Sequence, residues 1–405
     1  RNPMKLHANY HTHTTFCDGS DSAEAVVQEA IRKDFTHLGF SGHMDPGVFM
    51  DFQAYTAEIC RLQAAYRGKI DILRGAELDN VYDPCCVAGK RKTDAVQITH
   101  ERGAASGTVF SETSGLEASG GGAKSKMPGG DIVEISNRCG GSTKSKMPGA
   151  EYTIGSTHFV PVPGSTVWSH TAAFGSHREG SENWDLIGVD GDIGLLHDQC
   201  KKYYNGDFYA LSADYYRFEA CVAERLHPTF IGHFDLITRF NDLSREDGGH
   251  FLGEQSERYL GPARRAMAAL VPYGVPFEIN CGAMNRGRKK EVYPRPELLR
   301  ELHALGGEIL ISSDAHQKEL LDGGFEEAME VARWAGFTHT NLLVRGEKSE
   351  GQRSRNRTEA LCDQEHREAE RHPDRPYTWP QAERRVAKNT NADEGGLLYW
   401  QPVPL

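Results

Sequence analysis

Near its start, the sequence contains a short stretch of side chains that commonly bind metals. Within NYHTHTTFCDGSDS (residues 9–22), His11 and His13 are two residues apart, and Asp18 follows five residues after His13. Residues i and i+2 of an extended strand point to the same side, so two imidazoles at this spacing can share one ion. Histidine pairs also occur on solvated surfaces. This stretch alone therefore leaves two interpretations open, a metal site and an ordinary polar loop.

More residues of the same kind follow, each at or near the end of a short apolar run. They are His43, Glu77, His158, His233, Asp314 and His316. Imidazole and carboxylate groups without thiolate suit borderline divalent ions such as Zn, Mn or Fe, and the residue types do not choose among these metals. Cys17 and Cys281 lie close to these residues in sequence, and we interpret them as bystanders.

The elements that must position these residues can be predicted from apolar patterning. Runs typical of buried strands cover residues 4–10, 36–43, 71–79, 151–159, 228–236, 276–282 and 307–316. Helical spacing covers residues 21–34, 53–67, 208–226, 254–272, 296–305 and 323–335. Alternating strands and helices predict an α/β protein with a parallel sheet, either open or closed into a barrel. In both forms the carboxyl ends of the strands meet on one side, where the candidate residues would gather.

Three segments interrupt this alternation. Residues 84–150 are rich in Gly, Ser, Thr and Lys and contain the hexapeptide KSKMPG twice, which predicts an irregular insertion. Residues 161–183 are expected to form a shorter insertion. From residue 346 the sequence becomes polar and densely charged, which predicts a flexible tail over 346–405. The expected organisation is thus one α/β domain over 1–345 followed by this tail.

Composition narrows the classes of partner. The net charge of −11 disfavours nonspecific nucleic-acid binding, which requires a basic surface. Nine cysteines without a CxxC pair favour reduced thiols in a cytoplasmic protein over a disulfide framework. No run approaches the roughly 18 apolar residues of a membrane span, so no membrane partner is expected.

Seven motifs, in order along the chain, resemble those of the PHP superfamily, named for polymerase and histidinol phosphatase domains. They are HTH at 11–13, GFSGH at 39–43, RGAELD at 74–79, GSTHF at 155–159, IGHFDLITRFN at 231–241, FEINCGAMNRG at 277–287 and SSDAH at 312–316. Within the superfamily the chain is most similar to the histidinol-phosphate phosphatase branch. The resemblance covers about 5–83 and 151–344. It implies a distorted (β/α)7 barrel with three divalent metal ions.

Matched position by position, the resemblance implies three sets of ligands. The first ion would be held by His11, His13, Glu77 and Asp314. Glu77 would bridge to a second ion, bound also by His158 and His233. The third would be held by Asp18, His43 and His316. Many relatives have a histidine at position 19, where this chain has Gly19, so Asp18 is taken as the ligand.

The resemblance further implies a metal-dependent phosphomonoesterase that hydrolyses L-histidinol phosphate, a small-molecule substrate, in histidine biosynthesis. Asp314, His316 and Glu77 are the expected catalytic residues. Because phosphoryl transfer depends on positioning and charge stabilisation, guanidinium groups are expected beside the metals, and Arg239 and Arg286 are the candidates.

Three further interpretations concern a basic segment and two alternative functions. Arg288, Lys289 and Lys290 are interpreted as solvated surface charges. A phosphoesterase acting on another small phosphate ester or a nucleotide is an alternative. A non-catalytic scaffold for residues 84–150 is a third possibility, although a scaffold would not need the candidate ligands.

Overall fold

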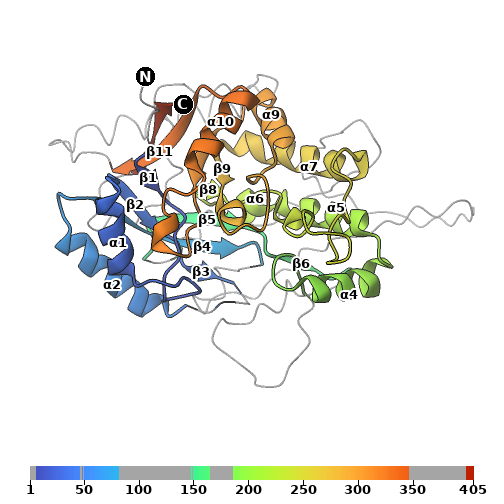
Figure 1. Cartoon of the computed structure of the whole chain (residues 1–405), viewed down its shortest axis with the longest axis horizontal. Coiled ribbons are helices and arrows are strands. Elements are labelled where there is room, and N and C mark those ends of the chain that lie inside the picture. Colours follow the sequence, from blue (N-terminus) through green and yellow to red (C-terminus); the bar gives the residue numbers. More distant parts are fainter. Residues whose placement is uncertain are drawn as a thin grey trace, which may run out of the picture.

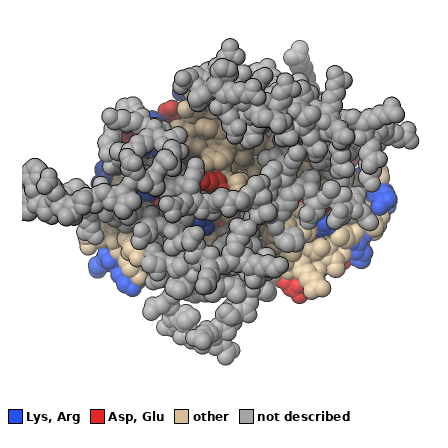
Figure 2. Space-filling view, turned by 180° about the vertical axis from the view of Figure 1, so that it is seen from behind, with Lys and Arg blue, Asp and Glu red and all other residues tan. Residues whose placement is uncertain are grey.

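The structure is a computed structural model, and it describes residues 6–45, 48, 50–81, 147, 149–164, 186–345 and 398–405. Most of these residues form a barrel with a parallel sheet at its centre and helices around it (Figure 1). The predicted insertions at 84–150 and 161–183 lie almost wholly outside the described residues. On the face shown in Figure 2, the described Lys and Arg side chains lie mainly at the margins.

Seven parallel strands make up the barrel wall. In sheet order they are β1 (Ala8–Asn9), β2 (His37–Phe40), β4 (Asp71–Asp79), β5 (Tyr152–Ser156), β8 (Phe230–Ile231), β9 (Phe277–Asn280) and β10 (Ile309–Ser312), and β3 (His43–Met44) continues from β2 along β4. Thr12 and Ala315 form a parallel bridge just beyond β1 and β10. Because this bridge joins the first and last strands, the sheet is nearly closed, and the predicted distorted barrel is confirmed.

Helices cover the outside of the barrel. They are α1 (Ala23–Arg32), α2 (Phe52–Ala65), α4 (Ile193–Tyr204), α5 (Phe208–Glu219), α6 (Val222–Leu226), α7 (Glu257–Leu270), α8 (Gly282–Asn285), α9 (Pro296–Ala304) and α10 (Phe325–Ala335). Ser22, Asp51, Asp192, Asp207 and Ser256 cap their helices by accepting hydrogen bonds from backbone N–H groups of the first turn. None of the helices in the described ranges is long and apolar enough to cross a membrane.

The end of the barrel opposite the carboxyl ends of the strands is filled by a compact apolar cluster. Tyr10, Tyr152 and Phe230 are fully buried there, and Trp400 is almost so. The hydroxyl of Tyr10 donates to the carbonyl of Leu343 at 3.0 Å, and Tyr152 donates to the carbonyls of Tyr10 and Phe40. These contacts hold the strands together at the end remote from the candidate ligands.

The last eight residues correct the predicted tail. Strand β12 (Leu398–Pro404) pairs antiparallel with β11 (His339–Arg345) along its whole length. Leu398 and Trp400 alternate with exposed residues and pack into the apolar cluster, so this part is a strand and not a flexible tail. Residues 346–397 lie outside the described part of the chain. A second antiparallel pair, β6 (Phe159–Pro161) with β7 (Leu186–Gly188), flanks the predicted shorter insertion.

Candidate active site

All of the predicted ligand residues lie at the end of the barrel where the strands finish, because each follows or ends a parallel strand. Their ligand atoms form four groups in which all atoms lie within 4.8 Å of one another. The groups are His11, His13 and Asp314; His11, Glu77 and His233; His43, Glu77 and His158; and His13, Asp18, His43 and His316. Residues up to about 300 positions apart are thereby brought into one cluster.

Glu77, near the end of β4, lies at the centre of this cluster. Its Oε2 is 3.2 Å from Nε2 of His11 and 3.5 Å from Nε2 of His13. Its Oε1 is 2.8 Å from Nε2 of His233 and 3.5 Å from Nε2 of His158. Oε2 also lies 3.1 Å from Nδ1 of His43. The carboxylate is 1% exposed, and its two oxygens face different sets of imidazoles. This geometry suits a carboxylate that bridges two cations.

Asp314 and Asp18 extend the cluster on two sides. Oδ1 of Asp314 lies 3.3 Å from Nε2 of His13 and 3.6 Å from Nε2 of His11. Asp18 lies 3.1 Å from Nε2 of His316 and 3.6 Å from Nε2 of His43. The side chain of Asp18 is 40% exposed, so this part of the cluster is the one open to solvent.

Of three carboxylates that the sequence did not single out, two orient imidazoles from behind, and the third, Asp45, shares Nδ1 of His43 with Glu77. Glu278 on β9 accepts a hydrogen bond from Nδ1 of His11 at 2.6 Å, and Asp79 accepts one from Nδ1 of His158 at 3.0 Å. Asp45 lies 3.1 Å from Nδ1 of His43. A carboxylate on one ring nitrogen leaves the other nitrogen free as a ligand. The available signal was an acidic residue in an otherwise apolar run, as in PFEINCG and DILRGAELD.

The electrostatics of the cluster favour cations. Burial lowers the pKa of His11, but Glu278, Glu77 and Asp314 together raise it well above its usual value. Burial raises the pKa of Glu77, yet the surrounding histidines His11, His43 and His158 hold it well below the usual range. Burial and the neighbouring rings of His316 and His43 lower the pKa of His13 to about 3, so this imidazole stays neutral, as a ligand must.

Unsatisfied atoms give an independent test of whether the residues fit divalent cations. Nε2 of His11, Nε2 of His13 and Oε2 of Glu77 are buried and make no hydrogen bond to any described residue. Buried polar atoms are normally paired, because an unpaired one loses its solvation without compensation. These orphaned atoms converge on shared points, and nitrogen and carboxylate oxygen are suitable donors for Zn, Mn or Fe. The residues therefore fit a site for divalent metal ions.

A cavity of about 300 Å³ adjoins the cluster. It is lined by candidate ligands and by Arg239, Arg286, Arg288, Asp190 and Tyr293, among others. Arg286 donates to the carbonyl of Asp314 at 3.1 Å and lies 2.6 Å from Nδ1 of His316, while Arg239 pairs with Asp190 at 3.2 Å. Nε of both arginines is buried without a hydrogen bond within the described ranges. The cavity thus has guanidinium groups beside the cluster, as an oxyanion site requires.

The interpretation of Arg288, Lys289 and Lys290 as solvated charges needs correction at two of the three positions. Arg288 has an exposed side chain but lines the cavity. Lys289 is only 8% exposed, because its side chain turns away from solvent toward the loop that follows β8. Lys290 is exposed, as expected.

Comparison with known proteins assigns the chain to a protein family. The PHP domain model matches residues 9–281, so the chain belongs to the PHP domain family. A protein of Schizosaccharomyces pombe, named "Probable histidinol-phosphatase", is 30% identical over 141 residues, which are 35% of this chain and 44% of that relative. The chain thus matches less than half of the length of this curated relative.

Two solved structures are similar to this chain. The crystal structure of hisK from Listeria monocytogenes has a TM-score of 0.52 and 15% identity, covering 79% of this chain and 99% of the other, and it supports the barrel fold. Histidinol phosphate phosphatase from Lactococcus lactis, solved with Zn, L-histidinol and phosphate, has a TM-score of 0.47 and 16% identity, covering 84% and 97%.

Proposed function

We propose that the protein is a metal-dependent phosphomonoesterase that hydrolyses L-histidinol phosphate to L-histidinol and inorganic phosphate. The observation that carries the proposal is the direct contact of two sites, a His and carboxylate cluster with orphaned ligand atoms and a cavity lined by guanidinium groups. Membership of the PHP domain family and the name of the Schizosaccharomyces pombe relative support the substrate.

The candidate ligands are proposed to hold up to three divalent ions. The first set is His11, His13, Glu77 and Asp314, the second Glu77, His158 and His233, and the third Asp18, His43 and His316, and in each set imidazole nitrogens lie within 3.6 Å of a carboxylate of the same set. Divalent ions here would neutralise charge on the phosphoryl oxygens and acidify a water for attack on phosphorus. Of the proposed catalytic residues, Glu77 and Asp314 supply the negative charge that holds cations, and His316 lies between Asp18 and Arg286.

The arginines are proposed to bind the phosphoryl group. The carbonyl of Asp314 and the ring of His316 hold the guanidinium group of Arg286 in one orientation. Arg239 is held by Asp190 in the same way. Water attacks phosphorus, the bond from phosphorus to the ester oxygen breaks, and the alkoxide takes up a proton. No covalent bond to the protein forms in this scheme.

A panel of phosphomonoesters tests the proposal. Protein loaded with Mn or Zn is assayed for release of phosphate from L-histidinol phosphate, a nucleoside monophosphate, a sugar phosphate and phenyl phosphate, with chelator-treated protein as the control. Preferred hydrolysis of L-histidinol phosphate that requires metal is the expected result. Hydrolysis of the other esters alone would reassign the substrate, and no release from any ester would overturn the enzymatic proposal.

A further inference from the structure

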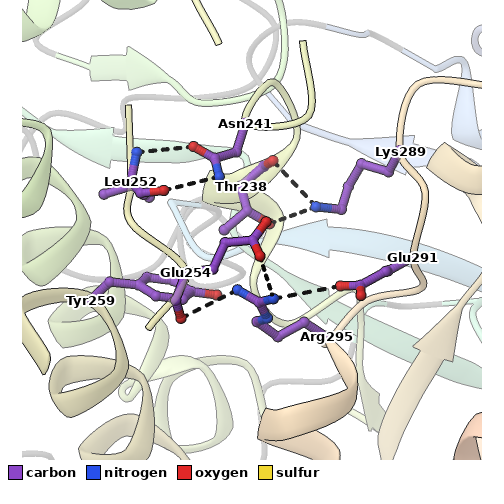
Figure 3. Close-up of a pocket in the computed structure, with 8 residues that line it drawn as sticks. All are labelled: Thr238, Asn241, Leu252, Glu254, Tyr259, Lys289, Glu291 and Arg295. Atoms are coloured by element: carbon purple, nitrogen blue, oxygen red, sulfur yellow. Dashed lines mark hydrogen bonds and ion pairs between the residues drawn. The ribbon is translucent and has the colours of Figure 1, made fainter. Parts of the chain in front are cut away.

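A second polar cluster lies beside the arginine-lined cavity, between the loop after β8 and the loop after β9. Figure 3 shows its eight residues around a space of about 10 Å³: Thr238, Asn241, Leu252, Glu254, Tyr259, Lys289, Glu291 and Arg295. A space of this size holds about one water molecule, so it is too small for an organic ligand. The charged groups around it must therefore act mainly on one another.

Lys289 is the member of this cluster that connects the two loops. Its ammonium donates to Oγ1 of Thr238 at 3.2 Å and to the carbonyl of the same residue at 3.4 Å (Figure 3). It also lies 3.9 Å from Asp242. Next to it, the backbone N–H of Lys290 donates to Asp242 at 2.8 Å. Burial of an ammonium group loses solvation free energy, and well-placed hydrogen-bond partners are needed to compensate for that loss.

The two loops that Lys289 connects carry the arginines of the cavity. Thr238 directly precedes Arg239, while Arg286 and Arg288 lie three and one residues before Lys289. We call residues 236–242 and 286–290 the arginine loops. Burial and the nearby guanidinium groups of Arg239 and Arg286 lower the pKa of Arg288, which shows that the three like charges are crowded. Their repulsion favours separation of the loops, and a contact between the loops must oppose it.

We propose that Lys289 is a positioning residue that holds the two arginine loops at the separation at which their guanidinium groups bind one phosphoryl group. This deepens the proposed function and rests on it. Lys289 faces the small polar cluster and does not line the cavity, so it acts through Arg239 and Arg286 and not on the substrate. The backbone contact from Lys290 to Asp242 remains when the Lys289 side chain is changed, so the loops should stay folded.

The test compares Lys289→Met with Lys290→Met, a matched control one residue away that removes an exposed charge. The readout is the dissociation constant of inorganic phosphate, measured by calorimetry on metal-loaded protein. In Lys289→Met this constant should rise about tenfold, at the lower end of the one to two decades expected for loss of a whole charge-assisted contact. Bound metal should not change, Lys290→Met should bind as the wild type does, and Lys289→Arg should recover part of the loss.

Phosphate binding in Lys289→Met equal to that of the wild type would overturn the proposal, even if the melting temperature fell, because only fold stability would then depend on Lys289. If Lys289→Met does not fold, Thr238→Val decides the question by removing the hydroxyl that accepts from Lys289 and that also donates to the carbonyl of Asp235 within its own loop. Weaker phosphate binding in that variant supports the proposal, and unchanged binding overturns it. Since binding needs no turnover, a wild type that binds phosphate but hydrolyses no ester would count against the proposed function and not against Lys289.

Discussion

Glu278 lies directly behind His11: its Oε1 is 2.6 Å from Nδ1 of the imidazole, and both side chains are fully buried. The second oxygen of Glu278 accepts the backbone N–H of His233 at 2.7 Å. One carboxylate on β9 therefore sets both the ring orientation of His11 and the path of the chain at His233. Its position couples two candidate ligands that are more than 200 residues apart in sequence.

Glu278→Gln tests this coupling. The amide can still accept from Nδ1 of His11, but it lacks the negative charge that makes the ring a strong ligand. Metal affinity should fall about ten- to a hundredfold, as is usual when the partner of a ligand imidazole is changed. Competition with a metal chelator measures the affinity. Glu326→Gln, which changes an exposed carboxylate of α10, is the control, and equal affinities in both variants would contradict the role of Glu278.

Glu77→Gln should cost more bound metal than the loss of any single histidine. Because the two oxygens of Glu77 face different sets of imidazoles, the variant weakens two proposed sites together, whereas His158→Asn or His233→Asn weakens one. Elemental analysis of the purified variants after dialysis gives metal equivalents per chain. A loss in Glu77→Gln no greater than in the histidine variants would show that Glu77 does not bridge.

The sequence predicted the barrel because periodic patterning and strand-end residues are local signals. The predicted strand at 71–79 coincides with β4, and the helical stretches at 53–67 and 296–305 match α2 and α9 to within two residues at each end. The candidate ligands were visible because His and carboxylate residues interrupt or end apolar runs. Parallel topology then places them together without further information.

The features that the sequence did not predict depend on contacts between distant segments. Lys289 lies in the basic run RGRKK, which is typical of a solvated surface, and its burial arises only because the loop after β8 packs over it. Strand β12 was missed because its apolar residues follow a long polar segment and acquire a partner only in β11. Helix α4, which begins at Ile193, was not predicted either, since its exposed Leu195 weakens the amphipathic pattern.

Glu219, the last residue of α5, should make the stability of the protein depend on pH. Burial raises its pKa from 4.5 to about 8, and the hydroxyl of Thr157 only partly offsets this. Between these pH values the folded state keeps a proton that the unfolded state releases, so stability falls as pH rises through this window. Glu219→Gln should therefore be more stable than the wild type at pH 8 by at least about 2 °C in melting temperature. The difference should shrink toward pH 5.

Thermal unfolding at several pH values between 5 and 8 measures this difference. Glu326→Gln should give a curve of melting temperature against pH parallel to that of the wild type, since this carboxylate is exposed. If Glu219→Gln also ran parallel to the wild type, the buried carboxyl would not carry the expected pH dependence.

Arg286→Ala separates catalytic function from fold. Charge-assisted contacts to a phosphoryl group contribute roughly 1.5–3 kcal/mol each, which corresponds to about one to two decades in kcat/KM. Arg286 also lies 3.4 Å from Asp314, and it holds the pKa of that carboxyl down together with the larger effect of His11. Because His11 remains in the variant, Asp314 should stay ionised. We therefore expect bound metal and the thermal transition to be retained while kcat/KM falls at least about tenfold.

Arg286→Lys distinguishes geometry from charge at the same position. A lysine keeps the positive charge, but its ammonium cannot reach the Asp314 carbonyl and His316 while also presenting a planar pair of donors to phosphate. It should therefore recover only part of the loss seen in Arg286→Ala. Steady-state kinetics with L-histidinol phosphate, with metal content measured on the same preparations, decides the matter. Kinetics like those of the wild type in both variants would remove Arg286 from the site, because a residue that only pairs with Asp314 and His316 would leave phosphate recognition untouched.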